Sequence, residues 1–299
     1  MLRRSFMCAA AIFSLLAIGA SEADSDHHRL CKGFVPPNDL RIPVGAKRNW
    51  AFMNATNGKG VTEAQYNTIV DRFERLYRDD FTKAGGTLIV NRLWESSLVG
   101  AFAGQKGDRW EIDMHGGLAR HAAITPDGLA LVICHEAGHH LGGAPKKRVA
   151  AWATNEGAAD YYAALKCLRR IFAEDDNATI VADAAIDLNV KENCERQFTA
   201  PSDRLICQRT SMASASVGQF FADLFREPRP PAFGTPDPSV VEKIFDGHPK
   251  SQCRLDTYFN GSICHVDVSV ALSNSDFREG SCVQPQDAVG FRPLCWFKP

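Results

Sequence analysis

The strongest chemical signal in the sequence is a pair of histidines four residues apart within an apolar run. His135 and His139 belong to Val-Ile-Cys-His-Glu-Ala-Gly-His-His-Leu, residues 132–141. In a helix, side chains four residues apart lie one above the other, so both imidazoles can reach one Zn²⁺ ion. Glu136 lies about 100° around the helix axis from His135, where its carboxylate can contact a water on the metal. The sequence therefore predicts a zinc site with Glu136 as the general base.

Two histidines leave a catalytic zinc site one protein ligand short, and the following residues supply a glutamate. A third histidine six residues after His139 is excluded because Pro145 stands there. Glu156 can bind the metal instead, and Asp160, one helical turn later, can accept a hydrogen bond from the spare ring nitrogen of a zinc histidine. Their neighbours are mostly apolar, which argues against an exposed acidic helix face. We expect one Zn²⁺ per chain, bound by the two histidines and Glu156.

The N-terminal residues have the layout of a secretory signal peptide over residues 1–23. Arg3 and Arg4 precede an apolar run from Phe6 to Ile18, and small residues near Ala23 offer a cleavage site. A membrane anchor is the alternative, but this run is too short to span a bilayer comfortably. No later stretch approaches about 18 uninterrupted apolar residues, so we expect no membrane span in the mature chain. The predicted location is periplasmic or secreted.

Composition and charge narrow the class of protein. Of the 299 residues, 45% are hydrophobic and 23% are charged, which is typical of a globular protein and excludes a disordered chain. The 34 lysines and arginines nearly balance the 35 aspartates and glutamates, so there is no basic excess to bind phosphates. We therefore expect no nucleic-acid partner.

The cysteines are consistent with export to an oxidising compartment. Of ten cysteines, Cys8 would leave with the signal peptide, and the other nine include no C-x-x-C pair that would indicate a zinc ribbon. Most of the nine should therefore form disulfides, with one thiol left over. Three neighbouring pairs could close short loops, and a fourth could join two predicted helices, but the sequence cannot fix the connectivity. These pairs are Cys194 with Cys207, Cys253 with Cys264, Cys282 with Cys295, and Cys134 with Cys167.

Before the zinc helix we expect an extended segment, one helix and two strands. Three prolines oppose helix formation in the extended N-terminal segment. Thr62 and Gln65 form a capping box that begins the first helix, and Gly85 ends it. The expected bounds are 24–61 for the extended segment, 62–84 for the helix, 87–94 and 110–114 for the strands, and 125–141 for the zinc helix.

Helical patterns dominate the chain after the zinc helix. They cover about 148–173, 178–198 and 203–226. A proline-rich loop follows at 228–238, and a turn-rich, cysteine-rich tail begins at about residue 246. Together with the two strands, these patterns predict an α+β fold that is mostly helical, with a small sheet. We divide the mature chain into a core over 62–227 and a C-terminal region over 228–299.

In its motifs the chain resembles the gluzincin metallopeptidases, in particular the branch of the CAAX prenyl proteases, the HtpX-like enzymes and their soluble periplasmic relatives. In that branch H-E-x-x-H is followed by E-x-x-A-D-x-x-A, which residues 156–163 match. Residues 99–103 are similar to the family's N-A-F-A-like segment, with glycine in place of the usual asparagine. His248, followed by proline and then by Arg254, looks like the family's late H-P loop. The likeness covers about 62–258.

The resemblance implies a zincin-type catalytic core, a zinc-dependent endopeptidase activity and a polypeptide substrate. His248, Arg254 and Tyr161 are candidates for stabilising the oxyanion. His248 has an alternative role as a fourth zinc ligand that keeps the enzyme latent. We also expect the strand at 110–114 to be an exposed edge to which a substrate peptide adds. The membrane helices of the integral members are absent, so their preference for lipidated substrates is not implied.

Two other functions are weighed against an endopeptidase. An exopeptidase needs an acidic cluster for the substrate N-terminus, and none can be identified. A disulfide-stabilised binding or scaffold protein with a structural zinc does not need Glu136, and a structural zinc site usually has four protein ligands. We therefore predict a hydrolase, more narrowly a metalloendopeptidase.

Overall fold

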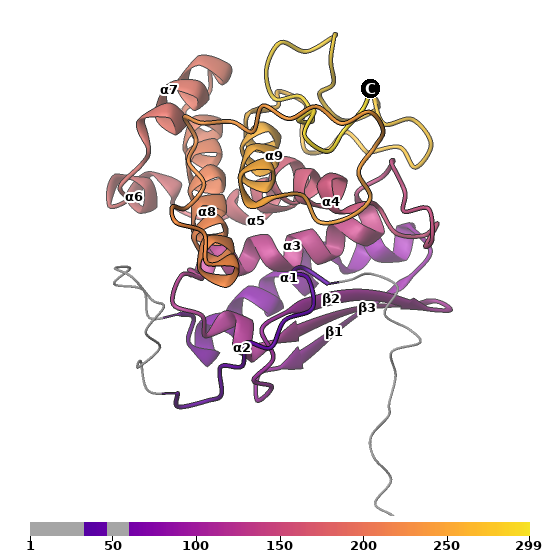
Figure 1. The fold of residues 1–299 in the computed structure, drawn as a ribbon, viewed down its shortest axis with the longest axis vertical. Helices are drawn as coiled ribbons and strands as arrows, with labels where there is room; N and C mark the ends of the chain where they lie inside the picture. The colour runs from indigo at the N-terminus through magenta and orange to yellow at the C-terminus, as the bar shows by residue number, and fades with distance from the viewer. Residues whose placement is uncertain (1–32, 47–59) are drawn as a thin grey trace, which may run out of the picture.

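The computed structural model of the chain describes residues 33–46 and 60–299. The predicted signal peptide and Cys31 lie outside the described residues. The fold is α+β, as predicted, with many helices and one small sheet (Figure 1). One helix crosses the middle of the molecule, with the sheet on one side and two further helices on the other (Figure 1). These helices are α3 (Pro126–Leu141), α4 (Glu156–Tyr162) and α9 (Ser251–Ile263).

Helix α1 (Glu63–Lys83) begins and ends where the sequence predicts. The Gln65 N–H donates to Thr62 Oγ1 at 3.3 Å, and the Thr62 N–H donates to Gln65 Oε1 at 3.0 Å, which forms the predicted capping box. Gly85 follows with a φ of +97°, a conformation that favours glycine. The helix packs one apolar face against α3 and the sheet. The buried residues of this face are Tyr66, Val70, Phe73, Tyr77 and Phe81.

The sheet has three strands, one more than the sequence analysis predicts. They are β1 (Thr87–Leu93), β2 (Ala101–Lys106) and β3 (Arg109–His115), in the order β1-β3-β2. Strand β3 is parallel to β1 and antiparallel to β2. The expectation that the strand at 110–114 is an exposed edge is therefore wrong, because β3 is central and has hydrogen-bonded neighbours on both sides. Among the described residues, β2 and β1 are the edges. Strand β2 was missed because Ala-Phe-Ala-Gly-Gln-Lys has a weak strand propensity.

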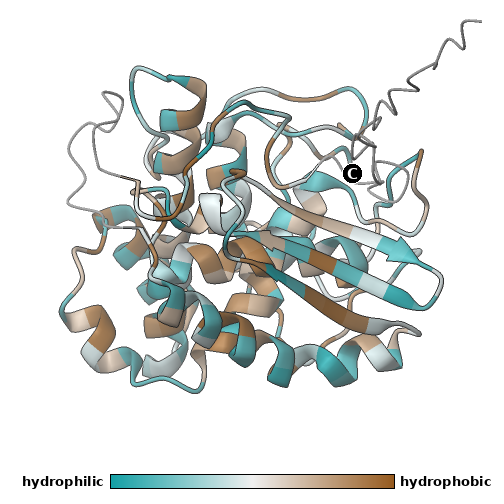
Figure 2. Cartoon of the chain, turned by 90° about the horizontal axis from the view of Figure 1, so that it is seen from below, coloured by the Kyte–Doolittle hydropathy of each residue, from teal (hydrophilic) through white to brown (hydrophobic). Residues whose placement is uncertain are grey.

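Helix α3 is buried over most of its length, which fits its nearly uniform apolar sequence. Thr125 caps its start by accepting a hydrogen bond from the Gly128 N–H at 3.0 Å. Gly138 allows α4 to approach closely, since a Cβ there would lie 2.8 Å from the carbonyl oxygen of Ala159. The view from below shows the strands in front of the helices, with hydrophobic stretches in both (Figure 2).

Two of the predicted helices differ from the structure in their extent. The helix expected over about 148–173 begins only at Glu156, where the Asn155 side chain caps it, and continues through a π-helical turn. The helix expected over about 178–198 is interrupted at 183–187. The observed elements are α4, η1 (Ala163–Leu168), α5 (Arg169–Phe172), α6 (Asn177–Ala182), α7 (Leu188–Gln197) and α8 (Pro201–Phe225). No helix of the described residues is long and apolar enough to span a bilayer.

The C-terminal region contains a helix where the sequence analysis predicts only turns. Helix α9 packs against α8, α4 and η1. The chain after Cys264 has no further helix or strand in the structure, but several residues from 281 onward are buried. Trp296 is fully buried, and its indole N–H donates to Thr257 Oγ1 at 2.9 Å. Its ring lies against Gly157 of α4, where an added Cβ would be only 2.1 Å from the ring.

Four disulfides connect these elements, and two of the four predicted pairs are confirmed. Cys134–Cys167 joins α3 to η1, and Cys194–Cys207 joins α7 to α8. The candidate pairs of 253 with 264 and 282 with 295 do not form, and the observed pairs are Cys253–Cys295 and Cys264–Cys282. The reason is α9, because cysteines at its two ends are roughly 16 Å apart along a helix, too far for a disulfide.

We predict that Trp296→Ala lowers the free energy of unfolding by about 3–5 kcal/mol, the usual cost of removing a large buried aromatic side chain. Denaturant unfolding followed by circular dichroism measures this change. Leu188→Ala is the control, because Leu188 is 67% exposed. Equal stability of the two variants would show that the C-terminal tail does not pack on α4 and α9 as described.

Candidate metal centre

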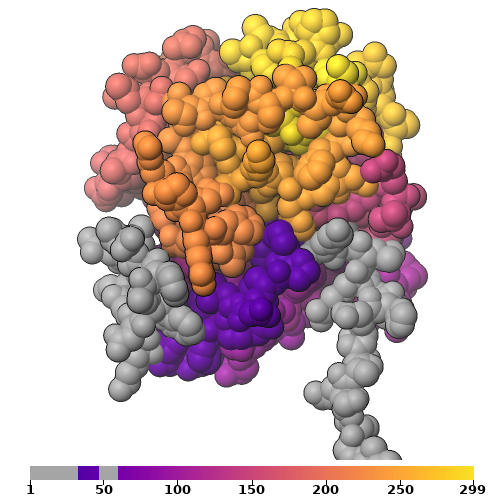
Figure 3. Space-filling view, viewed as in Figure 1, coloured from indigo at the N-terminus to yellow at the C-terminus, as the bar shows by residue number. Residues whose placement is uncertain are grey.

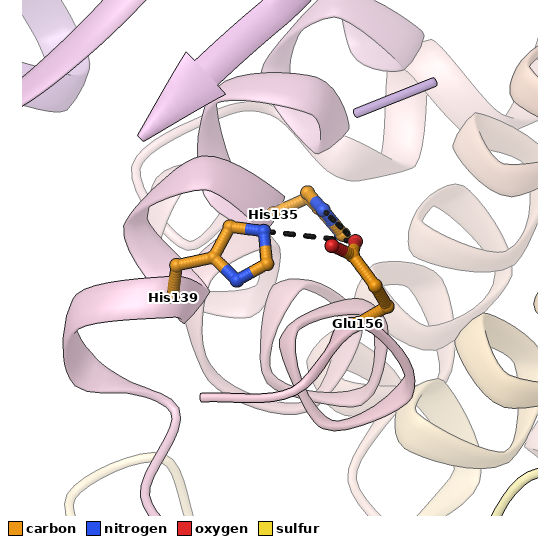
Figure 4. A group of neighbouring side chains, drawn as sticks. All are labelled: His135, His139 and Glu156. Atoms are coloured by element: carbon orange, nitrogen blue, oxygen red, sulfur yellow. Dashed lines mark ion pairs between the residues drawn. The ribbon is translucent and has the colours of Figure 1, made fainter. Parts of the chain in front are cut away.

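The structure brings the three predicted metal ligands together. Glu156 Oε2 lies 3.3 Å from His135 Nε2 and 3.7 Å from His139 Nε2, and all three side chains are fully buried (Figure 4). Two ligand atoms that are each about 2.0–2.1 Å from a tetrahedral zinc lie roughly 3.3 Å apart. The spacing of the three atoms therefore fits a metal ion bound between them.

Hydrogen bonds to the other ring nitrogen hold both histidines in position. His139 Nδ1 donates to the carbonyl oxygen of Thr154 at 2.9 Å, and His135 Nδ1 lies 2.6 Å from Asp160 Oδ1. Both Nε2 atoms consequently face Glu156. Such partners fix the tautomer and the orientation of a metal-binding imidazole. Asp160 thus lies where the sequence analysis expects it.

Unpaired polar atoms gather at this point of the molecule. Buried polar atoms normally have hydrogen-bond partners. Here five buried atoms have none among the described residues: His135 Nε2, His139 Nε2, Glu156 Oε2, Glu136 Oε1 and Glu136 Oε2. A cation between the first three atoms would give each of them a partner, so the donor chemistry also fits a metal.

Two of the three groups have the ionisation state that metal binding requires. Burial lowers the pKa of His139 to about 3, so this imidazole is neutral and able to bind a metal. Burial also acts to lower the pKa of His135, but the carboxylate of Asp160 outweighs it and raises the value to about 9. Burial acts to raise the pKa of Glu156, but the ammonium of Lys147 and the other charged groups beside it hold the value well below the usual range. A bound cation would take the place of the proton between His135 and Glu156.

Glu136 lies beside this group without joining it. Its side chain is fully buried, and burial raises its pKa to about 8. A carboxylate with a raised pKa and no hydrogen-bond partner is poorly stabilised as a structural residue. A carboxylate of this kind is able to act as a base.

Arg254 contacts the centre through Asp160. Its Nε donates to Asp160 Oδ2 at 2.8 Å and its Nη2 to Asp160 Oδ1 at 2.7 Å, while Tyr258 donates to Oδ1 as well. Nη1 donates to the carbonyl oxygen of Phe34 at 2.7 Å. Tyr161 is not brought to the centre. Its hydroxyl instead donates to the carbonyl oxygen of Gly290 in the C-terminal tail.

His248 lies next to the centre but outside the three-residue group. Its Nε2 is 3.6 Å from Glu156 Oε2 and 2.7 Å from the carbonyl oxygen of Gly33. A carbonyl only accepts, so His248 Nε2 carries a proton here and has no lone pair for a metal. In this structure the residue therefore acts as a hydrogen-bond donor and not as a fourth ligand.

Two parts of the centre were missed by the sequence analysis. The ammonium group of Lys147 lies 2.6 Å from Glu156 Oε1, so Oε2 is the atom left to face the histidines. Gly33 and Phe34, from the extended N-terminal segment, contact His248, Arg254 and His135. Neither feature has a signature in the sequence, because both depend on contacts between residues that no motif links.

Comparison of the chain with models of protein families, with curated proteins and with solved structures found no match. The resemblance to gluzincin metallopeptidases accordingly stays a prediction.

We predict that the mature chain binds about one transition-metal ion and that His135→Ala, His139→Ala and Glu156→Ala each abolish this binding, because two remaining ligands bind too weakly. Metal analysis by mass spectrometry after dialysis gives the stoichiometry. His265→Ala is the control, since His265 lies outside the group of His135, His139 and Glu156. Full metal content in all three variants would exclude this centre.

We predict that Asp160→Asn weakens metal binding about 10- to 100-fold, because the neutral amide no longer orients and polarises His135 through a charged hydrogen bond. Competition with a chromogenic chelator measures the affinity. Asp256→Asn serves as the matched control. Asp256 is also a buried carboxylate, but it accepts its hydrogen bonds from the Asp237 N–H and the Gln252 side-chain amide. The same loss in both variants would indicate general destabilisation and contradict an orienting role.

Proposed function

We propose that the chain is an exported zinc-dependent metalloendopeptidase that hydrolyses polypeptides. The observation that supports this most is the unpaired, buried carboxylate of Glu136 beside a group of two histidines and a glutamate. A metal site that only stabilises a fold needs no base and is usually closed by four protein ligands, whereas this group has three. The motifs shared with the gluzincin metallopeptidases support the same reaction class.

Zinc is the metal that suits two imidazoles and one carboxylate with a position left over for water. When bound, it would supply a Lewis acid that polarises a carbonyl and lowers the pKa of a water. Glu136 would accept the proton of the attacking water and pass it to the leaving amine. His248, as a donor, would stabilise the oxyanion, and we prefer this role to that of a latency ligand. Arg254 would orient His135 through Asp160.

Export is supported by the disulfides. Four pairs among the described residues fit an oxidising compartment, and the predicted signal peptide, cleaved near Ala23, fits a periplasmic or secreted protein. The substrate would then be a polypeptide outside the cytoplasm. A binding or scaffold protein with a structural metal is the alternative, and it is separated from a peptidase by the experiment below.

We predict that Glu136→Gln keeps the metal and the fold but lowers the rate of peptide hydrolysis by about a thousandfold, because the amide cannot take a proton from water. Cleavage of casein and of a peptide library by purified mature protein, with metal content measured on the same samples, provides the test. Glu95→Gln, which changes an exposed carboxylate, should leave the rate unchanged. Equal rates for Glu136→Gln and wild type would refute the mechanism, and zinc binding without hydrolysis in wild type would favour the scaffold.

A further inference from the structure

Residues 33–42, which we call the covering segment, run along the residues that lead into β2. The Phe34 N–H donates to the carbonyl oxygen of Ala101 at 2.9 Å, and the Ile42 N–H donates to the carbonyl oxygen of Ser97 at 2.8 Å. Arg41 and Leu98 form an antiparallel bridge between these two points. The covering segment therefore lies antiparallel to the chain at the start of this edge strand, as an added peptide strand would (Figure 1).

Two successive carbonyl groups of the covering segment are bound by residues of the metal centre. The Gly33 carbonyl accepts a hydrogen bond from His248, which is 3.6 Å from Glu156 Oε2. The Phe34 carbonyl accepts one from Arg254, which also binds Asp160. The backbone at these two residues is thus hydrogen-bonded to the edge strand on one side and to the side chains of His248 and Arg254 on the other. A polypeptide substrate needs both kinds of partner.

The side chain of Phe34 fills a pocket against the metal centre. The ring is fully buried and meets the imidazole of His135 edge-on, with centroids 5.1 Å apart. Phe221 of α8 lies 5.4 Å from it, and the guanidinium of Arg254 lies over its face at 4.7 Å. The pocket is apolar and cation-lined, which suits an aromatic ring better than an aliphatic or acidic side chain.

The covering segment packs against the centre, and the centre is closed to solvent. The metal-binding group is completely buried in its presence, and His248 is nearly so. In the space-filling view, dark indigo N-terminal residues fill the junction between the orange residues above and the purple residues below (Figure 3). A substrate would have to displace this segment to reach Glu136.

We infer, on the basis of the peptidase function proposed above, that this groove takes an extended polypeptide with an aromatic side chain in the Phe34 pocket. The covering segment is the chain's own occupant of the groove, and it blocks the site until it is displaced. The expected substrate class is therefore a polypeptide whose aromatic residue lies immediately beside the metal centre.

Gly33→Ala tests the inference in the full mature chain. Gly33 has a φ of +80°, and a Cβ there would lie 2.5 Å from the Phe102 ring and 2.8 Å from the Ala101 carbonyl oxygen, so the variant should detach the segment. Gly45→Ala is the matched control, since Gly45 has a φ of +71° but no atom within 4 Å of the added Cβ. Phe34→Ala is a second variant that removes the anchor without adding a clash.

Binding is measured by fluorescence polarisation with an acetylated, labelled peptide of residues 33–42. We expect Gly33→Ala and Phe34→Ala to bind it at least tenfold more tightly than wild type and Gly45→Ala do. A peptide with alanine at the Phe34 position should bind at least tenfold more weakly. The inference would be overturned if all four proteins bound the peptide equally. It would also be overturned if the two peptides bound equally. Loss of the fold in both test variants would overturn it as well, since the segment would then be an indispensable part of the core.

Hydrolysis is measured separately, with zinc-loaded protein and peptides that differ only in an aromatic or alanine residue. Gly33→Ala should cleave the aromatic peptide at least tenfold faster than wild type does. Peptide binding as expected without hydrolysis by any variant would refute the peptidase while leaving the groove and its occupant in place. Hydrolysis by wild type at the rate of Gly33→Ala would refute the blocking role while leaving the peptidase.

Discussion

Asp160 is a fully buried carboxylate of α4 that binds His135 of α3 and Arg254 of α9. A buried carboxylate is costly unless charged partners and hydrogen bonds surround it, and removing one partner usually costs about 3–5 kcal/mol. The three helices therefore have to meet at one point with their polar groups aligned. Because Arg254 also binds the Phe34 carbonyl, the same interaction reaches the covering segment. Helix packing, histidine orientation and closure of the centre all depend on this carboxylate.

The rest of the fold keeps this meeting point rigid. Cys134–Cys167 fixes α3 to the continuation of α4, and Cys253–Cys295 fixes the start of α9 to the C-terminal tail. Trp296 packs on both α4 and α9 and so opposes their separation. These restraints act on the helices that carry the candidate metal ligands and Asp160. Buried polar groups keep their hydrogen-bonding geometry best when the elements around them cannot move.

The parts of the centre that lie close in sequence could be predicted, and those that depend on distant contacts could not. His135 and His139 lie on successive turns of one helix face, so their spacing together with the following glutamate predicts a common metal ion. Glu156 could be predicted from chemistry because two histidines need a third ligand. Lys147 and Phe34 carry no such pattern, and their roles follow from how a loop and the N-terminal segment fold back. The same limit explains why α9 was missed. Its sequence has the composition of a turn-rich segment, and its helical structure depends on packing against the neighbouring helices.

Metal binding and closure of the centre share residues, which links them thermodynamically. His248 lies between Glu156 and the Gly33 carbonyl, and Arg254 lies between Asp160 and the Phe34 carbonyl. A cation bound to Glu156 would weaken the pull of that carboxylate on His248 and so change the hold on the covering segment. By reciprocity, whatever displaces the segment must change the affinity for the cation by the same factor. Glu156 belongs both to the candidate metal-binding group and to the contacts around His248, so it is the residue through which the two would be coupled.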